Sequence, residues 1–179
     1  MSYPTKAEIN GEIYELNTSY KTALRCLEVI NDNHIGDTER ALAVCKLIYG
    51  FVPTTNADVF LDKAILFLSC GEKREEEVQK RNFDHNYDFK YVTASFASDY
   101  HIDLTKEDLH WWRYCELLSG LTRNSILCRV VEIRDYDLSE VKDAKSRAEI
   151  LNAKESVALP ILETEEEREI REEFEKNFE

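Results

Sequence analysis

The sequence predicts a mainly α-helical protein: a compact bundle of about six to eight helices that begins with a short β-hairpin and ends in a charged amphipathic helix. Apolar residues recur at intervals of three and four positions along most of the chain. The 179 residues include only five glycines and three prolines, too few for the turns of a many-stranded β protein. Hydrophobic residues make up 43% of the chain, which suffices for one proper core.

The hairpin is expected over residues 8–17, because Asn10-Gly11 favours a tight two-residue turn. The apolar spacing then changes to that of amphipathic helices. Asp37, Asn56 and Asp137 are expected to cap three of them. Besides a helix that contains both tryptophans, helices are predicted over residues 18–30, 37–49, 56–70, 84–100, 124–133 and 137–158.

Both tryptophans of the chain stand side by side in the stretch HIDLTKEDLHWWRYCELLSGL. Thr105 is a natural N-cap with Asp108 at the third helical position, so a helix is predicted over residues 105–119. Neighbouring helical positions point about 100° apart, which places Trp111 and Trp112 on one wide apolar face. We expect one indole in the core and the other at its rim, with its N–H toward a polar partner. A half-exposed tryptophan would also suit a partner chain.

The C-terminal segment is rich in glutamate and carries a narrow apolar stripe. Ile170, Phe174 and Phe178 lie four positions apart, a pattern too thin to form a core by itself. The stripe is expected to dock on the chain's own body, on a second copy or on a partner. The predicted organisation is a helical domain with its hairpin over residues 1–160 and an acidic helical appendage over 161–179.

Charge and cysteine usage restrict the possible functions. The formal net charge of −13 argues against binding to nucleic acids and anionic membranes, which select a surplus of lysine and arginine. The five cysteines are widely spaced and form no C-x-x-C pair, as is typical of a reduced, intracellular protein. The sequence shows neither a signal peptide nor an apolar run of about eighteen residues that would span a membrane. We therefore expect a cytoplasmic protein that is not secreted.

A metal site is one chemical alternative, with His101, Asp103 and His110 as its ligands. Their spacing does not match the paired histidines of a helical metal motif, since two precede the predicted cap and one follows it. No cysteine stands at a ligand spacing from them. A helical metal-dependent enzyme that uses His85, His101 and His110 is retained as the weakest of the functional alternatives.

Other catalytic arrangements find less support. Cys115 lies between apolar neighbours, where a buried thiol is inert, and no nucleophile elbow or glycine-rich phosphate loop is present. Asp84, Asp88 and Glu116 could pair as acid and base, but a chain with thirty-six acidic residues offers such pairs by chance. The sequence therefore predicts no catalytic residues, no cofactor and no enzymatic activity.

Two stretches, YVTASFASDYHIDLTKEDLHWWRYCELLSGL and RVVEIRDYDLSEVKDAKSRAEI, resemble a known family. It is the bacteriophage tail-module family named after gene product fifteen of a tailed phage. The resemblance spans residues 8–160, and His110-Trp111-Trp112 is its most specific part. His101 departs from the pattern, which has a small residue such as glycine at this position.

This resemblance implies a gene in the tail-assembly cluster, next to the tape measure gene. It implies a tail assembly chaperone that binds the tape measure protein in the cytoplasm of the bacterial host. Trp111, Trp112 and the stripe of Ile170, Phe174 and Phe178 are then candidate partner-binding residues, and self-association is a further expectation. A structural virion component, such as a tail completion or connector protein, is the main alternative.

Overall fold

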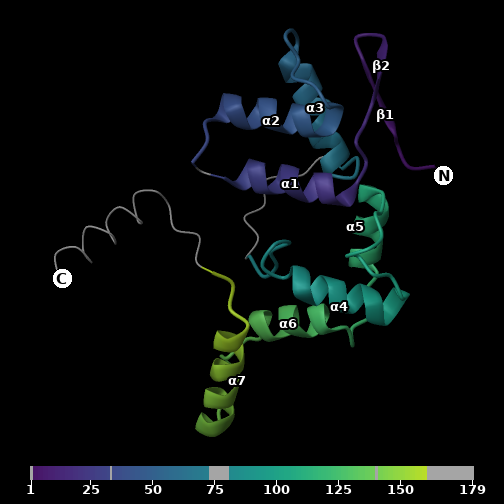
Figure 1. Cartoon of the computed structure of the whole chain (residues 1–179). Helices are drawn as coiled ribbons and strands as arrows, with labels where there is room; N and C mark the ends of the chain where they lie inside the picture. The colour runs from purple at the N-terminus through teal and green to yellow at the C-terminus, as the bar shows by residue number, and fades with distance from the viewer. Residues whose placement is uncertain (1, 33, 73–80, 140, 161–179) are drawn as a thin grey trace, which may run out of the picture.

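The computed structural model describes residues 2–32, 34–72, 81–139 and 141–160. Within these ranges it contains seven helices and one antiparallel hairpin (Figure 1), which confirms the predicted mainly α-helical fold. The elements are β1 (Lys6–Ile9), β2 (Glu12–Glu15), α1 (Tyr20–Asn31), α2 (Asp37–Tyr49), α3 (Ala57–Leu68), α4 (Phe89–Tyr100), α5 (Trp111–Ser119), α6 (Ile126–Asp135) and α7 (Ala144–Ser156).

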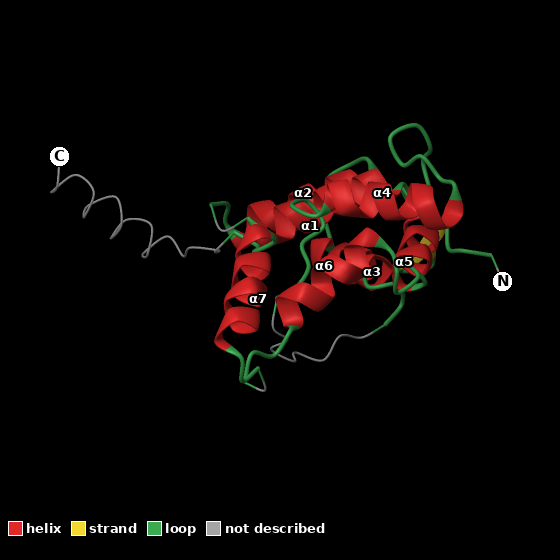
Figure 2. Cartoon of the chain, turned by 90° about the horizontal axis from the view of Figure 1, so that it is seen from below, coloured by secondary structure: helices red, strands yellow, loops and turns green. Residues whose placement is uncertain are grey.

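The helices form two packed groups that α5 connects. In the first group α1 packs on α2, α2 packs on α3, and β1 lies against α3. In the second group α4 packs on α6, while α5 contacts both α4 and α1. Helix α7 contacts α6 and lies at one end of the molecule (Figure 2). None of its residues is buried, so it extends from the body instead of contributing to the core.

The hairpin turns where the sequence predicts. Asn10 and Gly11 both have positive φ, 53° and 84°, as the two central residues of a type I′ turn require. Ile9 is buried, but Ile13 is 70% exposed, and the inward position on β2 belongs to Tyr14. The Tyr14 ring packs edge-on against Phe60 of α3, with 4.9 Å between ring centroids. This aromatic contact attaches the hairpin to the first helical group.

Aromatic rings fill the junction of α1, α4 and α5. The Tyr114 ring stacks on Tyr20 at 5.0 Å, on Phe96 at 5.4 Å and on Trp111 at 5.5 Å between centroids. The Tyr20 hydroxyl donates to the Leu104 carbonyl at 2.6 Å, so its polar end is satisfied inside the core. Burial raises the pKa of both tyrosines, which stay protonated.

Several predicted helix starts are wrong by a few residues. Helix α4 begins at Phe89 instead of Asp84, because the Asp84 carboxylate accepts the N–H groups of Asn86 and Tyr87 and so favours a turn there. Helix α7 is capped by Asp143, whose carboxylate accepts from the Ser146 N–H at 2.7 Å. Asp137, the predicted cap, instead accepts from the N–H and hydroxyl of Ser139 in a turn.

Two caps in the first group also differ from the prediction. Gly36 occupies the N-cap position of α2, and Asp37 is already the first helical residue. Asn56 does occupy the N-cap position of α3, but its backbone is left-handed, with φ at 53°, and its side chain makes no capping hydrogen bond. The predicted range 37–49 thus matches α2, and the range 56–70 matches α3 within two residues, but the capping interactions were misjudged.

The prediction that a helix starts at Thr105 is also wrong, since α5 begins at Trp111. The Tyr20 N–H donates to the Leu109 carbonyl at 2.9 Å, and the Trp111 N–H donates to the Thr18 carbonyl at 2.7 Å. This short antiparallel bridge needs extended backbone at residues 109–110, which a helix cannot supply. A long-range contact thus overrides the local capping signal.

His101 ends α4 in a left-handed conformation, with φ at 58°. This explains why a small residue such as glycine suits the position, since Cβ strains a left-handed backbone. We expect His101→Gly to raise the free energy of unfolding by about 0.5–1 kcal/mol. Urea denaturation measures it. A matched His101→Ala variant keeps Cβ and should show no such gain; equal stabilisation by both would contradict the backbone explanation.

Candidate functional site

The adjacent tryptophans together cover the end of α3. The Trp111 indole N–H donates to the Leu68 carbonyl at 2.9 Å, and the Trp112 indole N–H donates to the Phe67 carbonyl, also at 2.9 Å. The last carbonyls of a helix lack partners within the helix, so the two indoles satisfy consecutive ones. Trp111 is 3% exposed and Trp112 is half-buried, which confirms the expectation of one core and one rim tryptophan.

His110 occupies the N-cap position of α5 and is engaged through both ring nitrogens. Its Nδ1 accepts from the Trp112 backbone N–H at 3.1 Å, and its Nε2 lies 2.9 Å from the Pro4 carbonyl. Because a carbonyl only accepts, the neutral ring carries its proton on Nε2. Tyr3 stacks on the imidazole at 4.9 Å between centroids. The histidine thus joins the N-terminal segment to α5 and has no nitrogen left for a metal.

A first groove lies between β1, α3 and Trp112, and we call it the Trp112 groove. Its volume is about 240 Å³. Gly71 forms part of the wall with φ at +84°, and a Cβ there would stand 3.2 Å from Cη2 of Trp112. The glycine therefore allows both the left-handed turn and the close approach of the indole. The other lining residues are Pro4, Lys6, Ala7, Glu8, Leu16, Lys63, Leu66 and Phe67.

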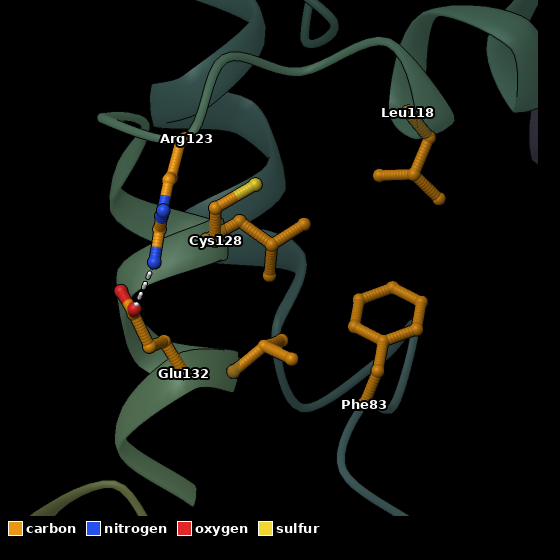
Figure 3. A pocket seen from close by; sticks show the side chains of 7 residues that line it. Phe83, Leu118, Arg123, Cys128 and Glu132 are labelled. Carbon is orange, nitrogen blue, oxygen red and sulfur yellow. Dashed lines mark hydrogen bonds and ion pairs between the residues drawn. The ribbon is translucent and has the colours of Figure 1, made fainter. Parts of the chain in front are cut away.

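A second groove lies between the end of α5 and α6, and we call it the Phe83 groove (Figure 3). Its volume is about 390 Å³. Five of its seven lining residues are apolar or thiol side chains: Phe83, Leu118, Leu127, Cys128 and Val131. Arg123 and Glu132 complete the lining and form an ion pair of 2.9 Å. Figure 3 shows Phe83 and Leu118 on the side of the groove opposite this pair.

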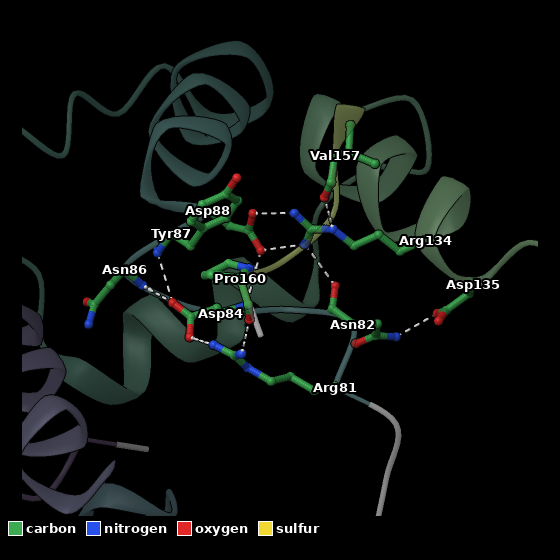
Figure 4. A network of polar contacts seen from close by, with 10 residues as sticks. All are labelled: Arg81, Asn82, Asp84, Asn86, Tyr87, Asp88, Arg134, Asp135, Val157 and Pro160. Carbon is green, nitrogen blue, oxygen red and sulfur yellow. Dashed lines mark hydrogen bonds and ion pairs between the residues drawn. The ribbon is translucent and has the colours of Figure 1, made fainter. Parts of the chain in front are cut away.

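A buried ion pair between Asp88 and Arg134 stabilises the second helical group (Figure 4). Both Asp88 carboxylate oxygens accept from the Arg134 guanidinium, at 2.6 and 2.7 Å, and the Asp88 side chain is fully buried. Arg134 also donates to the carbonyls of Val157 and Asn82 at 2.6 and 2.9 Å. The hydrogen-bonded carboxylate raises the pKa of Arg134. One guanidinium therefore connects three segments that are distant in sequence.

The remaining acidic candidates have structural partners. Asp84 forms an ion pair with Arg81. Burial raises the pKa of Asp84, but the hydrogen bonds from the Tyr87 N–H and Arg81 lower it by more, so the pKa lies below its ordinary value. Glu116 is exposed and accepts from the Tyr3 hydroxyl at 2.5 Å, which raises the pKa of that tyrosine. Asp88, Asp84 and Glu116 therefore stabilise turns and contacts in this structure, and they do not form the acid–base pair that the sequence analysis considered and set aside.

The residues of the alternative metal site are likewise not brought together. His101 is exposed at the end of α4. Hydrogen bonds from Lys106 and Thr105 lower the pKa of Asp103 to about 2. His85 lies against Trp111 and Tyr114 in the aromatic core. Among the residues that the structure describes, no three histidine, cysteine, aspartate or glutamate side chains form a group that could hold a metal ion.

None of the five cysteines forms a disulfide. Burial raises the pKa of the Cys26 thiol to about 12, so it stays protonated. Cys115 is half-buried on α5. Within the described ranges, no helix is both long and apolar enough to cross a membrane.

Ile170, Phe174 and Phe178 lie outside the described residues, as does the predicted appendage over 161–179. A family model described as Bacteriophage Gp15 protein matches residues 2–159. The chain belongs to the bacteriophage Gp15 protein family. This confirms the resemblance that the His-Trp-Trp stretch indicates. No curated protein and no solved structure matches the chain.

Membership in the Gp15 family makes the chain a phage structural or assembly protein. The family match includes both grooves, the paired indoles and the Asp88–Arg134 ion pair. Sequence reasoning had missed this ion pair and the Phe83 groove. A signal for the first was present, because Arg134 shares the buried face of α6 with Leu127 and Val130, and a charge on a buried face requires a partner.

Proposed function

We propose that this chain is a tail assembly chaperone that binds the phage tape measure protein in the cytoplasm of the bacterial host. Family membership supports a role in building the phage particle. The proposal that the chain binds the tape measure protein rests on the Trp112 groove, an apolar hollow beside exposed side chains of α3. Ile65 and Leu66 there are 42% and 40% exposed. Of the two, only Leu66 lines the groove, and an apolar client segment bound there would bury its side chain.

The Trp112 groove also distinguishes between the two tryptophans that the sequence suggests as partner-binding residues. Trp111 is buried and does not line the groove, so in this proposal it does not touch the client. Trp112 and Leu66 form the client-facing apolar wall. Lys6, Lys63 and Glu8 supply charges at the groove, which would fix the orientation of a bound segment. The negative charge of the chain would keep the complex soluble.

Co-expression with the tape measure protein of the same phage tests the proposal. An affinity tag is placed on this chain alone, and the eluate is quantified by mass spectrometry. The expected result is a soluble tape measure protein that co-elutes with more than one copy of this chain. An insoluble tape measure protein, with this chain purified alone, would count against the chaperone and favour a structural virion component. Mass spectrometry of purified phage particles then decides, because a chaperone is absent from the finished tail.

A charge placed in the Trp112 groove tests the site itself. Leu66→Glu is expected to reduce the co-purified tape measure protein by about tenfold, since a carboxylate would have to be desolvated against the client. Ile65→Glu is the matched control: it is adjacent and equally exposed, but does not line the groove. Circular dichroism verifies that both variants fold. Equal losses for the two variants, or no loss for Leu66→Glu, would show that the client does not bind in this groove.

A further inference from the structure

We propose that the Phe83 groove is covered by the chain's own C-terminal segment, residues 161–179, which inserts its apolar stripe of Ile170, Phe174 and Phe178. This inference goes beyond the chaperone role and does not depend on it. It concerns the protein alone, before any client is present. It assigns an occupant to the larger of the two grooves and a purpose to a stripe that cannot form a core by itself.

The first support is the nature of the groove. Its walls are Phe83, Leu118, Leu127, Cys128 and Val131, with polar groups only at the Arg123–Glu132 pair. Leu127 and Val131 lie four residues apart on α6, so they form one ridge along the helix surface. The stripe of the C-terminal segment repeats at the same interval of four. Matching ridges of this kind allow one helix to pack along another.

The second support is where the described chain ends. The Pro160 carbonyl accepts from the Arg81 guanidinium at 3.0 Å, and the Val157 carbonyl accepts from Arg134 at 2.6 Å (Figure 4). Residues 157–160 are thus held along the segment that begins at Arg81. Phe83, a wall of the groove, follows Arg81 by two residues, a span of at most about 7 Å. The chain therefore leaves the described body close to the groove.

The C-terminal segment is long enough to reach the groove and carries a charge opposite to that of the arginines near it. Ile170 lies ten positions after Pro160, a span of about 15 Å for a helix and up to about 35 Å for an extended chain. The stripe can therefore reach the groove without displacing the body. Residues 161–179 contain nine glutamates and three basic residues, a net charge of −6. The Arg123 side chain is 85% exposed at the rim, and Arg129 is exposed on α6, so both can meet these glutamates.

Tethering favours this occupant over a second copy or a client. A segment joined to the body by a short connection has an effective concentration in the millimolar range, far above that of a separate chain in solution. The segment would therefore shield the groove in the free protein even if its intrinsic affinity were weak. A stripe of three apolar residues is consistent with such weak, reversible docking.

Cys128 provides the probe, because its thiol lines the groove. The rate at which iodoacetamide alkylates Cys128 is measured in the full-length chain by peptide mass spectrometry. One variant combines Ile170→Ser, Phe174→Ser and Phe178→Ser. The matched control combines Arg168→Ser, Glu172→Ser and Lys176→Ser, which have the same spacing and would lie on the opposite face if the segment were helical. Cys115, which does not line the groove, serves as the internal reference.

Removal of the stripe is expected to accelerate alkylation of Cys128 about tenfold, while the control matches the unaltered chain. Equal rates in all three proteins would overturn the proposal, since the groove would then be open. A rate in the unaltered chain that rises on dilution would also overturn it, because the occupant would be a second copy. Neither result affects the co-expression test, which reports on the client.

A second measurement guards against an indirect effect of the substitutions. Phe174→Cys is expected to form a disulfide with Cys128 within one chain under mild oxidation, while Glu172→Cys is not. Non-reducing electrophoresis and peptide mapping identify the bond. A disulfide that links two chains, or none in the Phe174→Cys protein, would contradict docking of the segment on its own body.

Discussion

Replacing Asp88 with alanine is expected to lower the free energy of unfolding by about 3–5 kcal/mol. The substitution would leave the buried guanidinium of Arg134 without its counter-charge, and Arg134 is only 8% exposed. It would also remove the acceptor for the Asp84 backbone N–H at 3.0 Å. Urea denaturation, followed by circular dichroism, measures the change. Arg134→Lys should be costly too, since an ammonium cannot reproduce the bidentate contact.

An exposed ion pair of similar length provides the control. Glu132 lies 2.9 Å from Arg123, at the surface, and Glu132→Ala should cause no measurable shift of the urea midpoint. A double variant, Asp88→Leu with Arg134→Met, should recover part of the loss, because neither residue then buries a charge. If Asp88→Ala were as harmless as Glu132→Ala, the ion pair would not organise this part of the fold.

Replacing Trp111 with alanine is expected to cost about 3–5 kcal/mol, the range for a truncated buried aromatic residue. The substitution would open a cavity beside Tyr114 and leave the Leu68 carbonyl without its indole donor. Trp111→Phe retains most of the ring packing and isolates the lost hydrogen bond, at about 1–3 kcal/mol. Thermal and urea unfolding provide both values. The helical groups should separate more easily in either variant.

Tyr136 is the matched surface residue, because it is aromatic and 47% exposed. Tyr136→Ala should change the free energy of unfolding by only about 0.5 kcal/mol. A loss for Trp111→Ala that is no larger would show that the adjacent indoles serve the surface and not the end of α3. Trp112→Phe should lie between the two, since that ring is half-buried and also donates to a carbonyl.

The element types were predictable because each depends on local spacing. The stripe of Tyr20, Ala23 and Leu24 in α1 recurs at helical intervals, and all three residues are buried. The turn at Asn10-Gly11 depends on two neighbouring residues that tolerate positive φ. The start of α5 was not predictable in this way. It depends on backbone pairing of residues 109–111 with residues 18–20, about ninety positions away.

The candidate surfaces were predicted less well, for a related reason. Sequence periodicity predicted that one tryptophan lies in the core and the other at the rim, but it did not show which of Trp111 and Trp112 takes which place. The assignment required the position of α3, whose Leu68 and Phe67 carbonyls accept the two indoles. The Phe83 groove combines residues from three separate segments, so no local sequence pattern predicts it. The division of the chain at residue 160 stays a prediction, as do the roles of the C-terminal stripe.

The sequence by itself determined the helical class, the hairpin, the absence of a basic surplus and the family, because composition, periodicity and the His-Trp-Trp stretch are properties of the chain alone. Only the tertiary structure decided which charges are buried and which apolar faces stay open. Asp88 is one of thirty-six acidic residues, and packing alone made it the partner of Arg134. Burial and pairing depend on contacts between distant segments, and these exist only once the helices have packed.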